Sequence, residues 1–151
     1  MTNEQAEILM LTRAKTRGLE AFLRATEEFR AQALQGNPET LYEGLETFDR
    51  EREIALRSIQ LFDGKASLKA SRLPRDQREP SWIGTLREVV ADQERILEQI
   101  SRYDADITRL LESAQQTLQT ELRAGRVQQR SVAKFKSEWM GRAGEGLDTK
   151  L

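Results

Sequence analysis

The sequence predicts an all-α protein: an elongated antiparallel helical hairpin extended into a three-helix bundle, with a long third helix and a short C-terminal helix. Two observations predict this fold. The 151 residues are rich in Glu, Leu, Gln, Arg and Ala, and they include only 3 Pro and few β-branched residues. Apolar side chains also recur at steps of three and four over long stretches, as they do on one face of a helix. Because a chain of this length supports one core but not two, we expect a single domain over residues 1–151.

The first helix is predicted at about residues 4–35. Its apolar face holds Ile8, Leu11, Leu19, Phe22, Leu23, Phe29, Ala33 and Leu34. Gly36-Asn37-Pro38 should end it, because Gly permits a left-handed cap and Pro fits the first turn of the next helix. A tight reversal is therefore expected here.

The second helix is predicted at about residues 38–62 and should pair with the first as an antiparallel hairpin. Its seam is Leu41, Leu45, Phe48, Arg52, Ala55, Ile59 and Phe62. We expect Asp63-Gly64 to close this helix. Residues 63–80 contain two prolines and no sustained period, which predicts a mobile loop. Its cations are compatible with a contact to an acidic surface, but a solvated loop is the favoured interpretation because most charged loops are solvated.

The third helix is predicted at about residues 81–124, with Ser81 as its N-cap and Gly125 after its end. Its seam is Leu86, Val90, Gln93, Leu97, Ile100, Asp104, Ile107, Leu111, Ala114, Leu118 and then Glu121 or Leu122. A short amphipathic helix should follow at about 127–140, and the glycine-containing tail 141–151 should fray.

The lengths of these helices suggest a binding surface. At about 1.5 Å per residue the third helix would be roughly 64 Å long and the second only roughly 37 Å. The third helix would then draw level with the hairpin turn near residue 107 and overhang it afterwards. The C-terminal segment, a second copy of the chain or a helix of another protein could cover the apolar overhang. In the competing interpretation the flexible loop lets the third helix shift along the hairpin, so that no overhang exists and the stripe is ordinary core.

Three polar residues occupy seam positions: Arg52, Gln93 and Asp104. Counting along the helices places Arg52 near Gln93. Two interpretations are favoured: register control, because polar seam residues often specify how helices pair, or an arginine stem that lies along the seam and carries its charge to water. The acidic pairs Glu27-Glu28, Glu51-Glu53 and Asp104-Asp106 lack metal-ligand spacing and are interpreted as solvated faces.

The composition argues against several classes of function. The chain has no His and no Cys, which removes the commonest metal ligands, the thiol nucleophile and the usual general acid or base. We therefore expect no enzyme activity, no metal and no cofactor. A formal net charge of -1 disfavours nucleic-acid binding. The first thirty residues lack a signal peptide's apolar core, and no apolar run approaches about 18 residues, so we expect a cytoplasmic protein without membrane insertion.

Two stretches carry a resemblance to a known family. The first, residues 34–53, is similar to a Gly-Asp turn followed by a Leu-x-x-Leu helix and a charged run. The second combines Ile100–Glu112, Leu122–Arg126 and Val132–Ser137, similar to an Ile-x-x-x-Asp helix start, a basic kink and a closing aromatic residue. Over about residues 20–137 this pattern resembles the FlgN/FliT-type flagellar export chaperones.

The resemblance implies a bacterial type III export chaperone that holds late flagellar subunits by their helical C-terminal segments. It also implies the export gate or ATPase components as further candidate partners. In FlgN-like members a tyrosine near the end contacts the export gate, and the matching Phe135 lacks that hydroxyl. In FliT-like members the C-terminal helix covers the binding face until a client arrives.

The leading hypothesis is therefore an export chaperone that keeps a client's amphipathic helix soluble. The predicted partner-binding residues are the apolar face of the overhang together with the C-terminal segment: Ile107, Leu110, Leu111, Ala114, Leu118, Leu122, Val132, Phe135 and Trp139. The alternative is a structural coiled-coil or rod component of a secretion or flagellar assembly that acts by self-association. A homodimer is compatible with either hypothesis.

Overall fold

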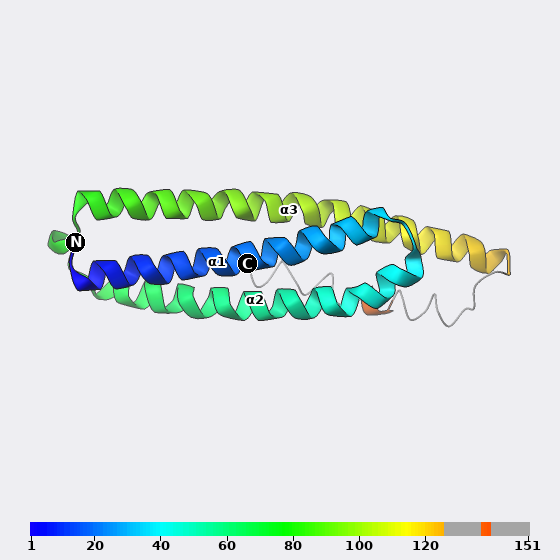
Figure 1. Ribbon diagram of the computed structural model, residues 1–151, viewed down its shortest axis with the longest axis horizontal. Coiled ribbons are helices and arrows are strands. Elements are labelled where there is room, and N and C mark those ends of the chain that lie inside the picture. Colours follow the sequence, from blue (N-terminus) through cyan, green and yellow to red (C-terminus); the bar gives the residue numbers. More distant parts are fainter. Residues whose placement is uncertain (126–136, 140–151) are drawn as a thin grey trace. The chain divides into compact units, whose positions relative to one another are not determined.

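The computed structural model describes residues 1–125 and 137–139. Three long helices make up most of this part: α1 (Asn3–Leu34), α2 (Pro38–Arg72) and α3 (Pro80–Arg123), with a short 3-10 helix η1 (Arg75–Gln77) between the last two (Figure 1). Residues 137–139 form one helical turn, and no strand occurs among the described residues. The predicted all-α fold, with three long helices and a short C-terminal one, is confirmed.

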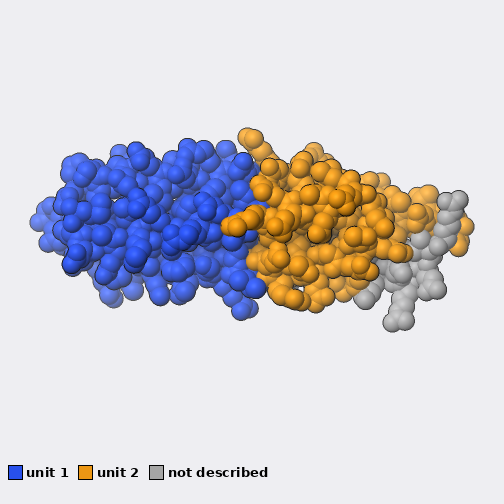
Figure 2. Space-filling model, viewed as in Figure 1, with its two compact units in different colours: residues 1–23, 53–100 blue, residues 24–52, 101–151 orange. Residues whose placement is uncertain are grey.

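The chain divides into two compact units, shown in Figure 2. Unit 1 comprises residues 1–23 and 53–100, and unit 2 comprises residues 24–52 and 101–151. Each unit contains a segment of α1, α2 and α3, so the same three helices supply both cores.

Local sequence explains both ends of α1. At the start, Thr2 and Gln5 form a capping box, in which the Gln5 N–H donates to Thr2 Oγ1 at 3.2 Å and the Thr2 N–H donates to Gln5 Oε1 at 3.0 Å. At the end, Gly36 has φ of 78°, the left-handed conformation expected of a helix-terminating glycine. The tight reversal before Pro38 is confirmed.

Helix α2 continues ten residues beyond its expected end, through Asp63 and Gly64 to Arg72, so most of the expected mobile loop at 63–80 is helical. Asp63 is a helical residue whose carboxylate accepts a hydrogen bond from Lys15 Nζ at 2.8 Å. The helix ends just before Leu73, which precedes Pro74 and is therefore disfavoured in helical conformation. Leu73 is itself buried, which anchors the connection.

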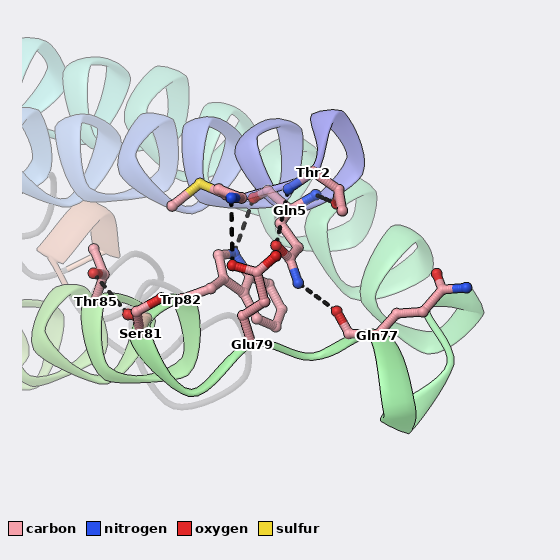
Figure 3. Close-up of polar contacts among 8 residues, drawn as sticks. Thr2, Gln5, Gln77, Glu79, Ser81, Trp82 and Thr85 are labelled. Atoms are coloured by element: carbon pink, nitrogen blue, oxygen red, sulfur yellow. Dashed lines mark hydrogen bonds and ion pairs between the residues drawn. The ribbon is translucent and has the colours of Figure 1, made fainter.

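The connection between α2 and α3 is held by a network at one end of unit 1 (Figure 3). The Trp82 indole N–H donates to the Gln5 carbonyl at 2.9 Å, and the Gln5 side-chain amide donates to the Gln77 carbonyl. Trp82 and Leu73 share a small core cluster with Ile8 of α1. These contacts fix the connection, because each ties it to the first two turns of α1.

Helix α3 begins with Pro80 at its first position rather than with a Ser81 cap. The first carbonyl to accept a helical hydrogen bond is that of Glu79, which receives the Ile83 N–H at 3.0 Å. Proline suits this position because its missing N–H would have no partner inside the helix. The expected cap at Ser81 is therefore wrong by two residues.

The longer α2 also shifts the pairing of α2 with α3. Arg52 lies opposite Asp104, eleven positions beyond the expected neighbour Gln93, with Nη1 donating to Oδ1 at 2.7 Å. Gln93 instead contacts α1, where its Nε2 donates to the Thr12 carbonyl and to Thr16 Oγ1, both at 3.0 Å. A reversal ten residues later along α2 accounts for this shift, because antiparallel helices pair at a nearly constant sum of positions.

Candidate helix-binding site

Four of the predicted partner-binding residues lie in the core of unit 2. The buried side chains of Ile107, Leu111, Ala114 and Leu118 pack with others from α1 and α2. The partners in this cluster are Phe29, Ala33, Leu41 and Leu45. The prediction of an uncovered apolar stripe on the third helix is therefore wrong for the residues up to Leu118. The later end of α2 explains the error, because it moves the residue level with the hairpin turn from 107 to about 118.

The remaining predicted residues of α3 lie at the margin of this cluster. Leu110 and Leu122 are half-buried and pack against it, together with Tyr42 and Phe48 of α2. Such positions are covered by neighbours on one side and open on the other, so they can gain contacts with an added helix. The candidate site is this apolar margin, defined by Tyr42, Leu110 and Leu122.

The described C-terminal turn, residues 137–139, docks on the same unit. Trp139 packs against the core cluster, and Tyr42 Oη donates a hydrogen bond to Glu138 Oε1 at 2.8 Å. Figure 1 shows this turn beside the N-terminal part of α2. Trp139 therefore packs on the same cluster as Leu110 and Leu122. Val132 and Phe135 lie outside the described residues.

Trp139 is held incompletely. Its indole Nε1 is buried and has no hydrogen-bond partner among the described residues, whereas the indole N–H of Trp82 donates to the Gln5 carbonyl. A buried donor that loses water without gaining a partner costs about 1–3 kcal/mol. The docked turn is therefore bound less favourably than its apolar contacts alone would give.

A polar network next to the site fixes the pairing of the helices. The Arg52 guanidinium lies 4.7 Å from the ring centroid of Phe48, which stacks on Phe29 at 4.3 Å. Burial raises the pKa of Asp104, while the charge of Arg52 and its hydrogen bond lower it in part. This arrangement agrees with a role of Arg52 and Asp104 in register, because sliding the helices would leave two buried charges without partners.

A second ion-pair group lies on unit 2. Arg30 Nε donates to Asp106 Oδ2 at 3.0 Å, and Arg109 binds the other oxygen of the same carboxylate. Hydrogen bonds from these two arginines lower the pKa of Asp106. No group of three or more acidic side chains among the described residues is arranged to hold a metal ion.

The sequence missed Tyr42 and Glu138 as site residues. Tyr42 directly follows the predicted seam residue Leu41, so its ring lies at the edge of the apolar face. Its position beside the seam was a usable signal, but nothing in the sequence indicated that the C-terminal turn reaches it.

No protein-family model, curated protein or solved structure matches the chain. None of the described helices is both long and apolar enough to cross a bilayer.

Proposed function

We propose that the protein is a cytoplasmic, non-catalytic export chaperone that binds amphipathic helical segments of late flagellar (type III) secretion substrates before export. The observation that carries the proposal is the docking of Trp139 on the core of unit 2 with a buried indole N–H that has no partner within residues 1–125 and 137–139. A segment held in this way is suited to replacement by a better ligand, because a client side chain without a polar atom avoids the cost of the unpaired donor.

The proposed client helix takes the place of residues 137–139. Its apolar face would contact Tyr42, Leu110 and Leu122, which are half-buried. The fully buried residues Leu111 and Leu118 support these contacts from below without touching the client. Binding and release then become a competition between two helical segments for one apolar margin.

The nature of the client rests on the sequence resemblance to FlgN/FliT-type chaperones, which also suggests the export gate or ATPase components as further partners. A docked C-terminal turn agrees with the covered state expected of FliT-like members. The contacts of the C-terminal turn support its role as a lid, and the sequence resemblance suggests the class of client.

The test is fluorescence anisotropy with labelled peptides corresponding to the helical C-terminal segments of secreted flagellar subunits. Trp139→Ala and a chain truncated after Gly125 should bind more tightly than the full chain, because the first weakens the docking of the competing turn and the second removes the turn. Leu110→Gln and Leu122→Gln should weaken binding by about tenfold each, because each variant loses the apolar contact of one side chain with the client.

Leu34→Gln is the matched control, because Leu34 is exposed and belongs to the same unit. It should leave both helicity and affinity unchanged. Weaker binding by Trp139→Ala would show that the turn is part of the binding site rather than a lid. Absence of binding by every variant would refute the chaperone assignment.

The alternative, a coiled-coil or rod component, is separated by light scattering. A rod component should form a stable higher oligomer without free monomer, whereas a chaperone should appear as a monomer or dimer.

A further inference from the structure

Helix α2 carries a row of exposed apolar side chains on unit 1. Ile54, Leu61 and Leu68 are 64%, 52% and 52% exposed. They are seven residues apart, so successive members lie nearly two helical turns apart on one side of the helix. The row, called here the α2 outer stripe, extends about 21 Å.

The bundle does not need these side chains for its core. The opposite face of the same helix holds the buried residues Ala55, Leu56 and Ile59. Single exposed apolar residues are common on protein surfaces, but three at seven-residue spacing fill one of the two apolar positions of each heptad in a seam that a second helix recognises. The spacing, rather than the exposure alone, indicates a docking surface.

The charges around the stripe are mostly positive. The exposed cations within one helical turn of its three members are Arg50, Arg57, Lys65, Lys69 and Arg72, and the acidic residues there are Glu51, Glu53 and Asp63. Lys69 is bound by Glu7 of α1 at 2.9 Å. Lys15 already binds Asp63 at 2.8 Å. Arg57 has a distant exposed partner in Glu53, at 3.5 Å. The stripe therefore presents an apolar seam with a basic border.

We propose that the α2 outer stripe binds an acidic amphipathic helix of another protein. Leucine-like side chains at heptad positions would pack between Ile54, Leu61 and Leu68, and flanking carboxylates would pair with Arg57, Lys65 and Arg72. Charge complementarity of this kind also steers association and sets the orientation of the partner.

The basic border decides against two other occupants. A second copy of the stripe would place cations opposite cations in either orientation, which is repulsive. A membrane surface would match the charge, but membrane-bound helices bury a broad apolar face, and this stripe has one large apolar side chain for every two turns. An acidic helix is narrow enough to pack along the stripe and has the charge opposite to that of its border.

This second surface belongs to unit 1, whereas the candidate client site belongs to unit 2, and its existence does not depend on the chaperone assignment. The probe is a labelled helical peptide with Leu at the a and d positions and Glu at the e and g positions. A second peptide with Lys in place of Glu has the same apolar seam and the opposite charge.

We expect the full chain to bind the Glu peptide and not the Lys peptide, with affinity that falls as salt increases. Ile54→Gln, Leu61→Gln and Leu68→Gln combined should weaken binding by at least about tenfold. Arg57→Glu, Lys65→Glu and Arg72→Glu combined should reverse the preference between the two peptides. Met10→Gln, at a 59% exposed position of unit 1, is the control and should change nothing.

Four results would overturn the proposal. They are failure to bind the Glu peptide, equal binding of both peptides, wild-type affinity in the apolar triple variant, and an unchanged preference in the charge-reversed variant. Circular dichroism checks that each variant is folded. Sedimentation tests for a second copy, and vesicles containing anionic phosphatidylserine test for a membrane. Self-association that Leu61→Gln abolishes would assign the stripe to a second copy instead. Vesicle binding that Leu61→Gln abolishes would assign it to a membrane instead.

Discussion

Removing one partner of the Arg52–Asp104 pair should destabilise the protein far more than removing both. The side chains are only 10% and 12% exposed, so neither charge is well solvated when the other is absent. Arg52→Leu leaves a buried carboxylate, which typically costs about 3–5 kcal/mol. The double variant Arg52→Leu/Asp104→Leu restores an apolar seam and should lie within about 1 kcal/mol of the original stability.

The two single variants should differ. Asp104→Leu leaves the Arg52 guanidinium over the Phe48 ring, where it keeps a cation–π contact, and its long stem can carry the charge towards water. Asp104 has no comparable escape. Asp104→Leu should therefore cost less than Arg52→Leu, by about 1–2 kcal/mol.

Urea unfolding followed by circular dichroism at pH 7 measures these differences through the transition midpoints. The Arg52→Leu defect should also shrink on acidification. Burial raises the pKa of Asp104 above its unfolded value of 3.8, and loss of Arg52 raises it further. The folded variant then binds a proton more tightly than the unfolded chain, so stability falls as pH rises through the folded pKa. A double variant as unstable as Arg52→Leu would refute this account.

Three other predictions follow from single contacts. Gly18→Ala should destabilise because its new Cβ would lie 2.9 Å from Ile59 Cγ1, whereas Gly64→Ala meets nothing within 4 Å and should stabilise by about 1 kcal/mol in thermal unfolding. Leu111→Ala, at a buried position, should cost about 2–5 kcal/mol in urea unfolding. Arginine hydrogen bonds lower the pKa of Asp106, so its stabilising effect relative to Asp106→Asn should be present above pH 3.8 and disappear as pH falls, in pH-dependent melting curves.

The helical fold could be predicted because heptad spacing records which side chains face a neighbour. The predicted seam residues Leu41, Leu45, Ala55 and Ile59 are buried, as are Ile100 and Leu111. The end of α2 could not be predicted in the same way. Gly64 looks like a helix stop, but a helical glycine costs only about 1 kcal/mol. Burial of Leu73 beyond it offsets that cost.

The position at which α2 ends accounts for most of the errors in the predicted site. Placing the reversal ten residues too early misplaced the partner of Arg52 and left Leu111 and Leu118 uncovered. Errors in helix length therefore affect the prediction of a site more than errors in seam assignment. When the turn moves, every residue of an antiparallel pair acquires a different partner. Trp82 was missed for a related reason. It precedes the predicted seam and is buried only because the connection folds against Gln5.

The balance of forces on the C-terminal turn decides whether a client can displace it. Burial of a large apolar side chain contributes about 1.5–3 kcal/mol, and the Trp139 indole N–H, which finds no partner in the described part of the chain, costs about 1–3 kcal/mol. The hydrogen bond from Tyr42 to Glu138 adds about 1.5–3 kcal/mol at most, because its acceptor is a charged group and the pair is only partly buried. These opposing contributions are of similar size, and each 1.4 kcal/mol by which the docked form is favoured weakens a competing ligand about tenfold. Trp139→Phe keeps the apolar contact and removes the unpaired donor, so it should hold the turn more firmly and weaken peptide binding, whereas Trp139→Ala should strengthen it. Opposite shifts from these two substitutions are the result expected if the Trp139 side chain competes with the client.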